Sequence, residues 1–499
     1  MKSQSILVPL ALSVVLGTVR ASAQTPVYHA NLMGISDGRT NIQVEHATRL
    51  NRWGQVIGTY GGGLSGGTHA VLWTPDAAND GSGNAINGAG SLFGIESSSG
   101  LPAGTADTGT TGLNDRGQVV GQAFTPGQGD GNQTQSWMWK PKTLNSNKGV
   151  LHGNSGKAVT FPLLTIPGLG TLAEYNQIIN NKGVIGAYGI NYRALLWTPS
   201  VPNGLLGDWT FDPANGGGPA AINDAGQIAG STCENSIWNG PYLHSGALPL
   251  LVTDVLTSPL WIPPSSQECV GGVSGMNVKG DLAISAVSSS VNAIHAYLYK
   301  NGAATDISTG FSSQTSAINN YDQVVGHVDS DTRRAYLFQN GQAFDLNGLN
   351  DSTNGVFLGD SLAINDSGQI LCGGVFSGAG SSTVLLTPNA LVINPVTFTL
   401  GALQHNGSTY TQVITLTNKG TTTITGPISV ALDGLPSGVT LTNATGTTMY
   451  TGPGSAYVDV SASDLVAGST TSSFTLVFSN PGHVAIKFKG RALGSPAAR

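Results

Sequence analysis

Residues 113–121 carry the sequence LNDRGQVVG: an apolar residue, then Asn, two further residues, Gly and a short apolar run. The same phrase recurs along the chain, so an internal repeat decides the fold. Its seven copies centre on Asn51, Asn114, Asn180, Asn223, Asn277, Asn319 and Asn365. The shortest intervals between them, 42, 43 and 46 residues, match the length of a four-stranded propeller blade. The longer intervals indicate insertions.

The phrase has the chemistry of a β-hairpin. Asn favours the first position of a type I turn because its side-chain oxygen accepts hydrogen bonds from the turn, and Gly at the fourth position tolerates a positive φ. Asp322 replaces that Gly in the sixth copy, which is allowed because Asp enters the left-handed region more easily than most residues. The apolar runs after the turn are continuous, as expected for strands covered on both faces.

A further strand follows each run, for example His69–Trp73, Arg193–Trp197 and His295–Tyr299. The Asn-x-x-Gly-x-Val-Val-Gly phrase followed by a His-Ala-aromatic strand resembles the bacterial extracellular HAF repeat family, over about residues 27–388. That resemblance implies a secreted, propeller-like repeat protein and no particular reaction. The seventh copy supplies three strands, and Val27–Ile35 precedes the first copy. We therefore expect this N-terminal strand to complete the last blade and remove open sheet edges.

The composition changes after Pro388. Short apolar runs alternate with Gly, Asn and Pro at a spacing typical of a sandwich. The segment is similar in a general way to an immunoglobulin-like domain, without the antibody-type Cys and Trp. The predicted class is all-β: a signal peptide over 1–23, a seven-bladed β-propeller over 24–388 and an immunoglobulin-like β-sandwich over 389–499.

The first residues predict export. Lys2 supplies the positive start, Ile6–Val19 is mostly apolar, and Ala21-Ser22-Ala23 is a small-x-small cleavage site. The alternative, a membrane anchor, needs about 20 apolar residues. We expect a secreted protein, extracellular or periplasmic, beginning at Gln24 and without stable membrane insertion.

Composition excludes some function classes. The chain has 499 residues with 21 Lys and Arg against 27 Asp and Glu, a net charge of −6. Phosphate repulsion therefore argues against nucleic acid as a partner. Hydrophobic residues make up 39%, which argues against disorder.

Three cysteines are present, Cys233, Cys269 and Cys372. An odd number leaves at least one thiol unpaired within the chain. The sequence leaves open whether Cys233 and Cys269 form a disulfide, and we expect Cys372 to be a buried free thiol. No metal-ligand spacing occurs, so neither metal nor cofactor is expected.

Aromatic side chains are the candidate binding residues. Trp53 and Tyr321 occupy the same turn position in the first and sixth copies, and turn tips are normally exposed. Together with Trp261, in another long loop, they could stack on sugar rings. The alternative is that long insertions fold over these rings and bury them. His327 follows its strand without an equivalent in other repeats and is a further candidate.

Two function classes remain. The first is a non-enzymatic binding or cell-surface protein, most simply a monomer, with an extracellular glycan or a surface protein as partner. The second is an extracellular polysaccharide hydrolase or lyase. Its catalytic residues are not identified by the sequence, although Glu174, Asp208 and Asp212 lie in long connections. The insertions at 74–90, 141–156 and 198–208 share a face with the Asn turns, so recognition is expected on that loop-rich face.

Overall fold

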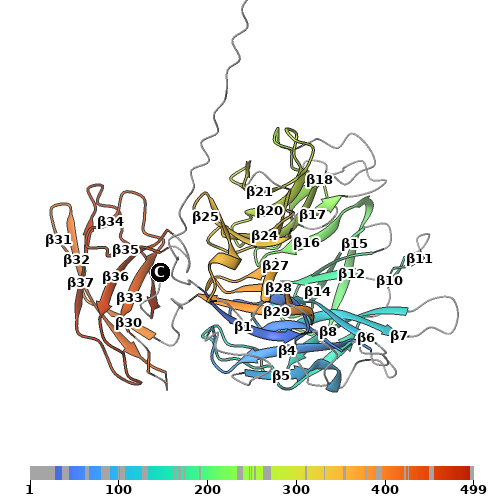
Figure 1. Ribbon diagram of the computed structural model, residues 1–499, viewed down its shortest axis with the longest axis horizontal. Helices are drawn as coiled ribbons and strands as arrows, with labels where there is room; N and C mark the ends of the chain where they lie inside the picture. Colours follow the sequence, from blue (N-terminus) through green and yellow to red (C-terminus); the bar gives the residue numbers. More distant parts are fainter. Residues whose placement is uncertain are drawn as a thin grey trace, which may run out of the picture.

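The computed structural model shows an all-β protein (Figure 1). It describes residues 28–35, 44–61, 67–79, 90–98, 101, 107–125, 133–161, 164–166, 170–172, 175–189, 193–232, 240–246, 248, 250–251, 254–261, 271–308, 312–330, 332–351, 356–376, 379–388, 396–420, 423–424, 426–448 and 454–494. The expected signal peptide, 1–23, lies outside these residues. Among the residues described, none forms a helix with the length and hydrophobicity needed to cross a membrane.

The first seven sheets of the described chain are antiparallel and follow one another in sequence. Sheet 1 contains β2 (His46–Leu50), β3 (Val56–Tyr60), β4 (His69–Pro75) and β5 (Gly90–Gly94). Sheet 2 contains β6 (Asp107–Leu113), β7 (Val119–Thr125), β8 (Gln133–Pro141) and β9 (Gly156–Thr160). Sheet 3 contains β12 (Tyr175–Ile179), β13 (Ile185–Tyr188), β14 (Arg193–Pro199) and β15 (Gly207–Gly216). Sheet 4 contains β16 (Gly218–Ile222), β17 (Gln227–Thr232) and β18 (Gly240–Ser245).

The remaining three of these sheets repeat the pattern. Sheet 5 contains β19 (Gly271–Met276), β20 (Leu282–Val287), β21 (Ile294–Lys300) and β22 (Ala303–Asp306). Sheet 6 contains β23 (Ser313–Ile318), β24 (Val324–Val328), β25 (Arg334–Gln339) and β26 (Gln342–Asp345). Sheet 7 contains β27 (Val356–Ile364), β28 (Ile370–Phe376), β29 (Ala379–Pro388) and β1 (Tyr28–Ile35). Between sheets lie the pair β10 (Leu164–Ile166) and β11 (Gly170–Leu172) and the short 3-10 helices η1 (Ile95–Ser97) and η4 (Leu346–Gly348).

The N-terminal strand completes the last sheet, as expected. β1 pairs antiparallel with β29, with Tyr28 opposite Pro388 and Ile35 opposite Ser382. Tyr28 and Met33 are fully buried. The strand therefore covers an edge of sheet 7 that would otherwise be open.

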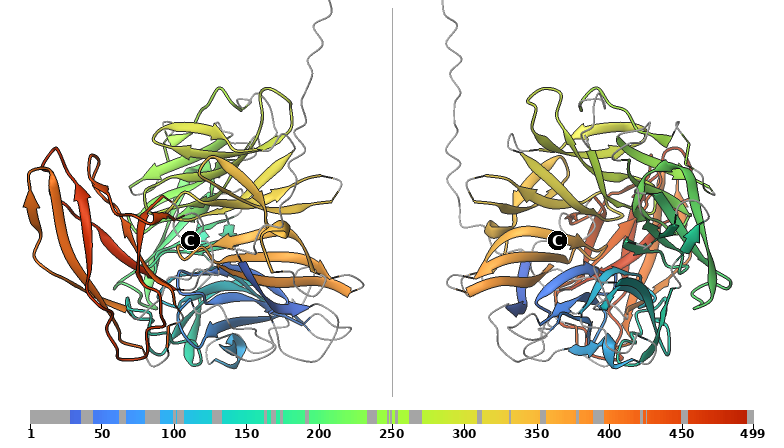
Figure 2. Two further views of the ribbon diagram at one scale, coloured as in Figure 1. Left: turned by 60° about the vertical axis from the view of Figure 1, so that its left-hand side comes forward. Right: turned by 90° about the vertical axis from the view of Figure 1, so that its right-hand side faces the viewer.

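Apolar clusters join neighbouring sheets in a circle. Val120 and Met138 of sheet 2 pack with Ile185 and Trp197 of sheet 3, and equivalent clusters join each successive pair. One more cluster joins sheet 7 to sheet 1. Sheets covered on both faces explain why their strands are continuous apolar runs rather than alternating ones. In the right-hand view of Figure 2 the sheets surround a common centre.

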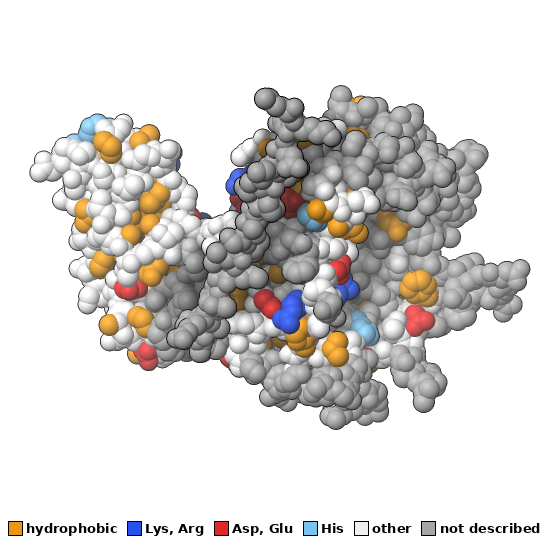
Figure 3. Space-filling model, turned by 45° about the horizontal axis from the view of Figure 1, so that its top comes forward, with side chains coloured by type: hydrophobic (Ala, Val, Ile, Leu, Met, Phe, Trp, Pro, Cys, Tyr) orange, Lys and Arg blue, Asp and Glu red, His pale blue; other side chains and the backbone are white. Residues whose placement is uncertain are grey.

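The C-terminal unit has two sheets and its own core. One sheet contains β30 (Val396–Leu400), β31 (Gln404–Asn406), β32 (Thr409–Asn418), β34 (Thr440–Leu441) and β37 (Phe474–Ser479). The other contains β33 (Ile428–Asp433), β35 (Gly446–Thr447), β36 (Ala456–Ser461) and β38 (Lys489–Leu493). Residues from both sheets, including Leu416 and Val430, form one apolar cluster. Charged side chains are sparse on the face of this unit that Figure 3 shows.

Candidate functional site in the central channel

The Asn of each repeat organises its turn through its side chain. In the second copy, Asn114 Oδ1 accepts hydrogen bonds from the backbone N–H groups of Arg116 (3.1 Å) and Gln118 (2.9 Å). Its Nδ2 donates to Gln118 Oε1 at 2.9 Å and to the backbone oxygen of Asn180 at 2.8 Å. The expected positive φ follows, 81° at Gly117 and 61° at Asp322. The turn chemistry predicted from the sequence is therefore confirmed.

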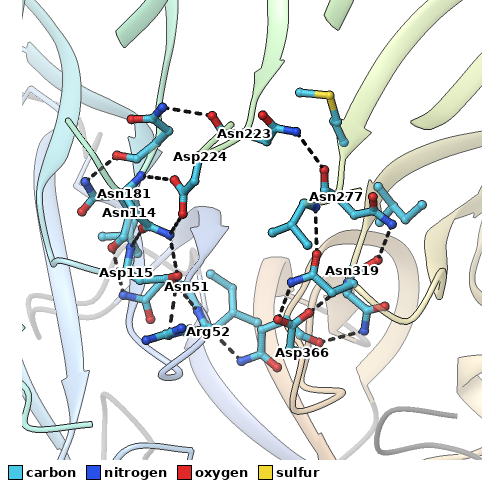
Figure 4. Close-up of a pocket in the computed structure, with 18 of the residues that line it drawn as sticks. Asn51, Arg52, Asn114, Asp115, Asn181, Asn223, Asp224, Asn277, Asn319 and Asp366 are labelled. Atoms are coloured by element: carbon cyan, nitrogen blue, oxygen red, sulfur yellow. Dashed lines mark hydrogen bonds and ion pairs between the residues drawn. The ribbon is translucent and has the colours of Figure 1, made fainter. Parts of the chain in front are cut away.

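These Asn side chains also form a closed circle (Figure 4). Each Asn donates from Nδ2 to the backbone oxygen of the Asn in the next repeat, over 2.8–3.4 Å; the donors are Asn51, Asn114, Asn180, Asn223, Asn277, Asn319 and Asn365. The last bond, from Asn365 to Asn51, measures 3.1 Å and joins sheet 7 to sheet 1. The repeated Asn thus links neighbouring sheets as well as forming the turn.

A cavity of about 210 Å³ lies at this circle of turns. The residue after each Asn lines it, and Asp115, Asn181 and Asp224 illustrate the contacts. Asn181 Nδ2 donates to Asp115 Oδ2 (2.9 Å) and to Asp224 Oδ2 (3.0 Å). Asp115 Oδ1 accepts from the backbone N–H of Arg52, and Asp224 Oδ1 from that of Asn181. The carboxylates therefore hold adjacent turns together.

Burial raises the pKa of the Asp115 carboxyl above its ordinary value, against the opposing effects of Arg52 and Asn181. A catalytic carboxylate needs an oxygen that can reach substrate. In Asp115 and Asp224 both oxygens already accept hydrogen bonds from the protein. These carboxylates therefore belong to a ring of hydrogen bonds that stabilises the turns.

An apolar collar separates this cavity from the rest of the channel. The residue before each Asn forms it: Leu50, Leu113, Ile179, Ile222, Met276, Ile318 and Ile364. These residues line both the small cavity and a middle cavity of about 230 Å³. The collar is therefore a hydrophobic layer across the channel.

The other mouth of the channel is wider and differently lined. Its cavity measures about 600 Å³, within the range of small-molecule sites. Hydroxyl groups line it at Thr48, Thr110, Thr111, Tyr188, Ser231, Ser274 and Ser316, and the apolar lining includes Ile178, Pro219 and Val273. Small-molecule sites combine apolar walls with placed polar groups in this way.

Arg49 projects into this wide mouth. Its side chain lines both the wide and the middle cavity, and Nη1 donates to the backbone oxygen of Thr48 at 2.9 Å. Although Arg49 is exposed to solvent, desolvation by the surrounding protein lowers the pKa of its guanidinium. The group still carries its charge at neutral pH. No Asp or Glu is among the described residues that line this cavity.

Gln177 lies beside it on β12. Its side chain is fully buried and lines the same cavity. Within the described part of the chain, neither Nε2 nor Oε1 has a hydrogen-bond partner. A buried amide left unpaired costs about 1–3 kcal/mol for each group. Because both polar atoms of Gln177 are closed off from solvent as well as unpaired, this side chain presents no accessible polar group to a ligand.

Trp53 and Trp261 are not exposed platforms. Trp53 is 8% exposed and donates from Nε1 to the backbone oxygen of Asp115 at 3.0 Å. The first insertion folds back over its turn, where the Asn79 N–H donates to the oxygen of Trp53. Trp261 is 2% exposed and packs edge-to-face against Tyr297, with ring centres 5.6 Å apart. The expected exposure of these two rings is therefore wrong, and their burial agrees with the alternative that insertions and neighbouring strands cover them.

Tyr321 is half-buried and contacts the C-terminal unit. Its hydroxyl donates to Asp433 Oδ2 at 3.1 Å, and the Arg491 guanidinium lies 5.3 Å from its ring centre. This contact joins the C-terminal unit to the face of the Asn turns, and in Figure 2 the unit lies beside the ring of sheets. Tyr321 serves an internal contact.

His327 is buried in an ion-paired cluster. Its Nδ1 lies 3.1 Å from Asp360 Oδ1, and Arg333 Nη2 lies 2.9 Å from the same oxygen. The His327 hydrogen bond, with the charge of Arg333, holds the pKa of Asp360 below its ordinary value despite burial. His327 lines none of the three channel cavities.

The remaining candidates do not converge. Asp208 is exposed and Asp212 is buried, and both lie on β15, the strand of sheet 3 furthest from the channel-lining β12. Glu174, Cys233 and Cys269 lie outside the described residues. Cys372 is a buried free thiol, as expected. No group of three metal-binding side chains occurs in the described chain.

The sequence motifs did not point to Arg49, although the repeats carry a signal for it. Two residues before each Asn, the other repeats have Gly112, Ile178, Ala221, Gly275, Ala317 and Ala363, where the first has Arg49. This is the single charge at that repeat position. Aligning the repeats by their Asn would have exposed it.

Comparisons with known proteins assign no family to this chain. No family model matches the sequence, and no curated protein is similar to it. Among solved structures, an acylaminoacyl peptidase from Pyrococcus horikoshii is similar with a TM-score of 0.40 and 9% identity. The match covers 75% of this chain and 58% of the peptidase chain. That likeness is too low to indicate a shared fold or activity.

Proposed function

We propose that the protein is a secreted, non-enzymatic binding protein, built as a seven-bladed β-propeller of HAF-type repeats followed by an immunoglobulin-like sandwich. The closed circle of Asn hydrogen bonds supports the ring. The separate apolar core of the C-terminal unit supports the second domain. Export rests on the apolar N-terminal segment and its cleavage site.

The ligand is a carbohydrate that binds in the wide mouth of the channel. The observation that carries this proposal is the cavity of about 600 Å³ lined by seven hydroxyl-bearing residues. Hydroxyl groups exchange hydrogen bonds with sugar hydroxyls, and apolar side chains such as Ile178 and Val273 contact the C–H faces of a sugar ring. Ligand sites combine such apolar walls with a few placed polar groups.

Binding without turnover fits the lining better than hydrolysis does. Glycosidases use two carboxyl groups about 5–9.5 Å apart across the scissile bond. The described lining of the wide mouth includes neither Asp nor Glu. The carboxylates of the opposite mouth, Asp115 and Asp224, are hydrogen-bonded into the turns.

The test is binding and turnover on a polysaccharide panel, using the chain from Gln24 to Arg499. We expect retention on at least one glycan without new reducing or unsaturated ends. Ser316→Ala, in the mouth, should weaken retention about fivefold by removing one hydroxyl group, whereas Thr305→Ala, exposed on β22, should not. Product release would contradict the non-enzymatic proposal. Binding to none of the glycans would contradict the proposal of a carbohydrate ligand.

A further inference from the structure

The charge of the wide mouth is opposite to that of the whole chain. The protein carries a net charge of −6, yet Arg49 is the only charged side chain among the described residues lining this cavity. Low-dielectric walls concentrate the field of such a charge, so the potential in a cleft exceeds that over an open surface. The mouth is therefore a local site for an anion on an acidic protein.

Arg49 has donors left for that anion. A guanidinium has five N–H donors in a planar fork, which binds a carboxylate through two parallel hydrogen bonds. In the described structure one bond from Arg49 to the protein is formed, from Nη1 to the oxygen of Thr48. An exposed lysine would present a point charge, but the fork selects a planar, two-oxygen partner.

The groups around Arg49 favour a hydroxylated ligand over a bare anion. Ser316 lines both the wide and the middle cavity, as Arg49 does, and its hydroxyl can donate and accept hydrogen bonds. Thr48 and Thr110 share one hydrogen bond of 3.0 Å between their hydroxyls, and each hydroxyl has further acceptor capacity. Ile178, which lines both cavities with Arg49, adds an apolar wall. A small inorganic ion would leave most of this surface unused.

We propose that the ligand of the wide mouth is an acidic saccharide, a sugar that carries a carboxylate, and that Arg49 binds this carboxylate. This inference rests on the carbohydrate-binding function proposed above and names its substrate class. The Ser and Thr hydroxyls that line the mouth bind the sugar hydroxyls. The carboxylate lies deepest, because Arg49 lines the passage toward the collar.

The experiment compares matched ligands by calorimetric titration. An oligogalacturonate and the neutral oligogalactose of equal length are titrated into the wild-type protein, Arg49→Gln and Arg49→Lys. Inorganic phosphate and sulfate are titrated separately. Arg116→Gln, at the opposite face where Arg116 donates to Asn147, is the control for loss of one positive charge.

We expect the acidic ligand to bind at least tenfold more tightly than the neutral one. Arg49→Gln should abolish that difference without changing neutral binding, Arg49→Lys should retain part of it, and Arg116→Gln should leave it intact. The acidic preference should also fall as salt rises, a readout that does not depend on any variant folding.

Equal binding of both saccharides would overturn the inference while leaving the proposed function intact, and so would an acidic preference that survives Arg49→Gln. Phosphate binding as tightly as the oligogalacturonate would also overturn it, because the site would then select charge alone. If neither saccharide binds while another glycan of the panel does, the inference is overturned and the proposed function stands. If no glycan binds, the proposed function itself is contradicted.

Discussion

The hydroxyl of Tyr321 donates to Asp433 Oδ2 at 3.1 Å, although 112 residues separate the two in the sequence. Asp433 also accepts from Arg491 Nε and Nη2, both at 2.9 Å, and from Ser455 at 2.5 Å. Burial alone would raise the pKa of Asp433, but the hydrogen bonds and charge of Arg491 outweigh it and hold that pKa below its ordinary value. A turn of the ring thus contacts a buried ion pair of the C-terminal unit.

This geometry predicts that Asp433→Asn destabilises the C-terminal unit by about 3 kcal/mol, because it removes the carboxylate that balances the charge of the buried Arg491. Tyr321→Phe, which removes one neutral donor, should cost about 1 kcal/mol. Denaturant unfolding at pH 7 measures both changes. Equal stability of Asp433→Asn and the wild type would contradict the account of the ion pair.

The same pair predicts a pH dependence. A carboxyl whose folded pKa is depressed contributes stability above its unfolded pKa and loses it as pH falls through the folded pKa. The stability difference between wild type and Asp433→Asn should therefore be constant above about pH 5 and shrink below about pH 4. Thermal unfolding of both proteins across pH 2–7 measures this stability difference. A difference that grows as the pH falls would contradict a depressed pKa of Asp433.

The circle of Asn hydrogen bonds predicts that removing one Asn side chain lowers the free energy of unfolding substantially. Asn114→Ala removes four hydrogen bonds from a residue that is 3% exposed. We expect a loss of about 2–4 kcal/mol in the free energy of unfolding. Asn147→Ala, exposed on the same face, should change it by less than about 0.5 kcal/mol. Similar losses in the two variants would mean that the circle is not a stabilising element.

We expect Trp53 to stabilise the folded protein and to play no part in ligand binding. Trp53→Ala should destabilise the ring by about 3–5 kcal/mol, because it empties a buried aromatic position. Trp53→Phe keeps most of the packing and loses the hydrogen bond to Asp115, so its loss should be smaller. Ligand affinity of Trp53→Phe should equal that of the wild type in calorimetric titration. If a folded Trp53→Phe variant bound the ligand tenfold more weakly, the indole of Trp53 would have to belong to the binding site.

Closure by the first strand is also testable. A chain beginning at Ser36 lacks β1, which exposes an edge of β29 and the pocket that Tyr28 and Met33 fill. We expect this chain to aggregate, whereas one beginning at Gln24 should elute at the monomer volume in size-exclusion chromatography. A well-folded monomer without β1 would show that closure is dispensable.

Much of the ring could be predicted from the sequence, because one local phrase encodes it. Asn, Gly and the apolar run each specify backbone geometry within a few residues, so turns, strands and their recurrence followed. Pairing of β1 with β29 followed from counting strands. The circle of bonds from each Asn to the next was not predicted, because a single copy contains no information about which carbonyl lies beside it.

The site was predicted less well. Trp53 was chosen because turn tips are usually exposed, but the insertion that brings Asn79 onto its oxygen covers it. Arg49 and Gln177 lie within strands. From the sequence alone, a polar residue in a strand is expected to face solvent, as many others do. Only the ring closure turns those positions inward toward a shared channel. Convergence of residues from separate repeats depends on this closure and is not encoded by spacing along one strand.

The central claim is that a saccharide binds in the wide mouth of the channel. Its most direct test is a crystal structure of the protein with the tightest oligosaccharide of the panel. We predict that the sugar lies in the cavity lined by Arg49, Tyr188 and Ser316, with its carboxylate on the guanidinium of Arg49. A sugar bound instead to the C-terminal unit, or at the Asp115 mouth, would contradict it.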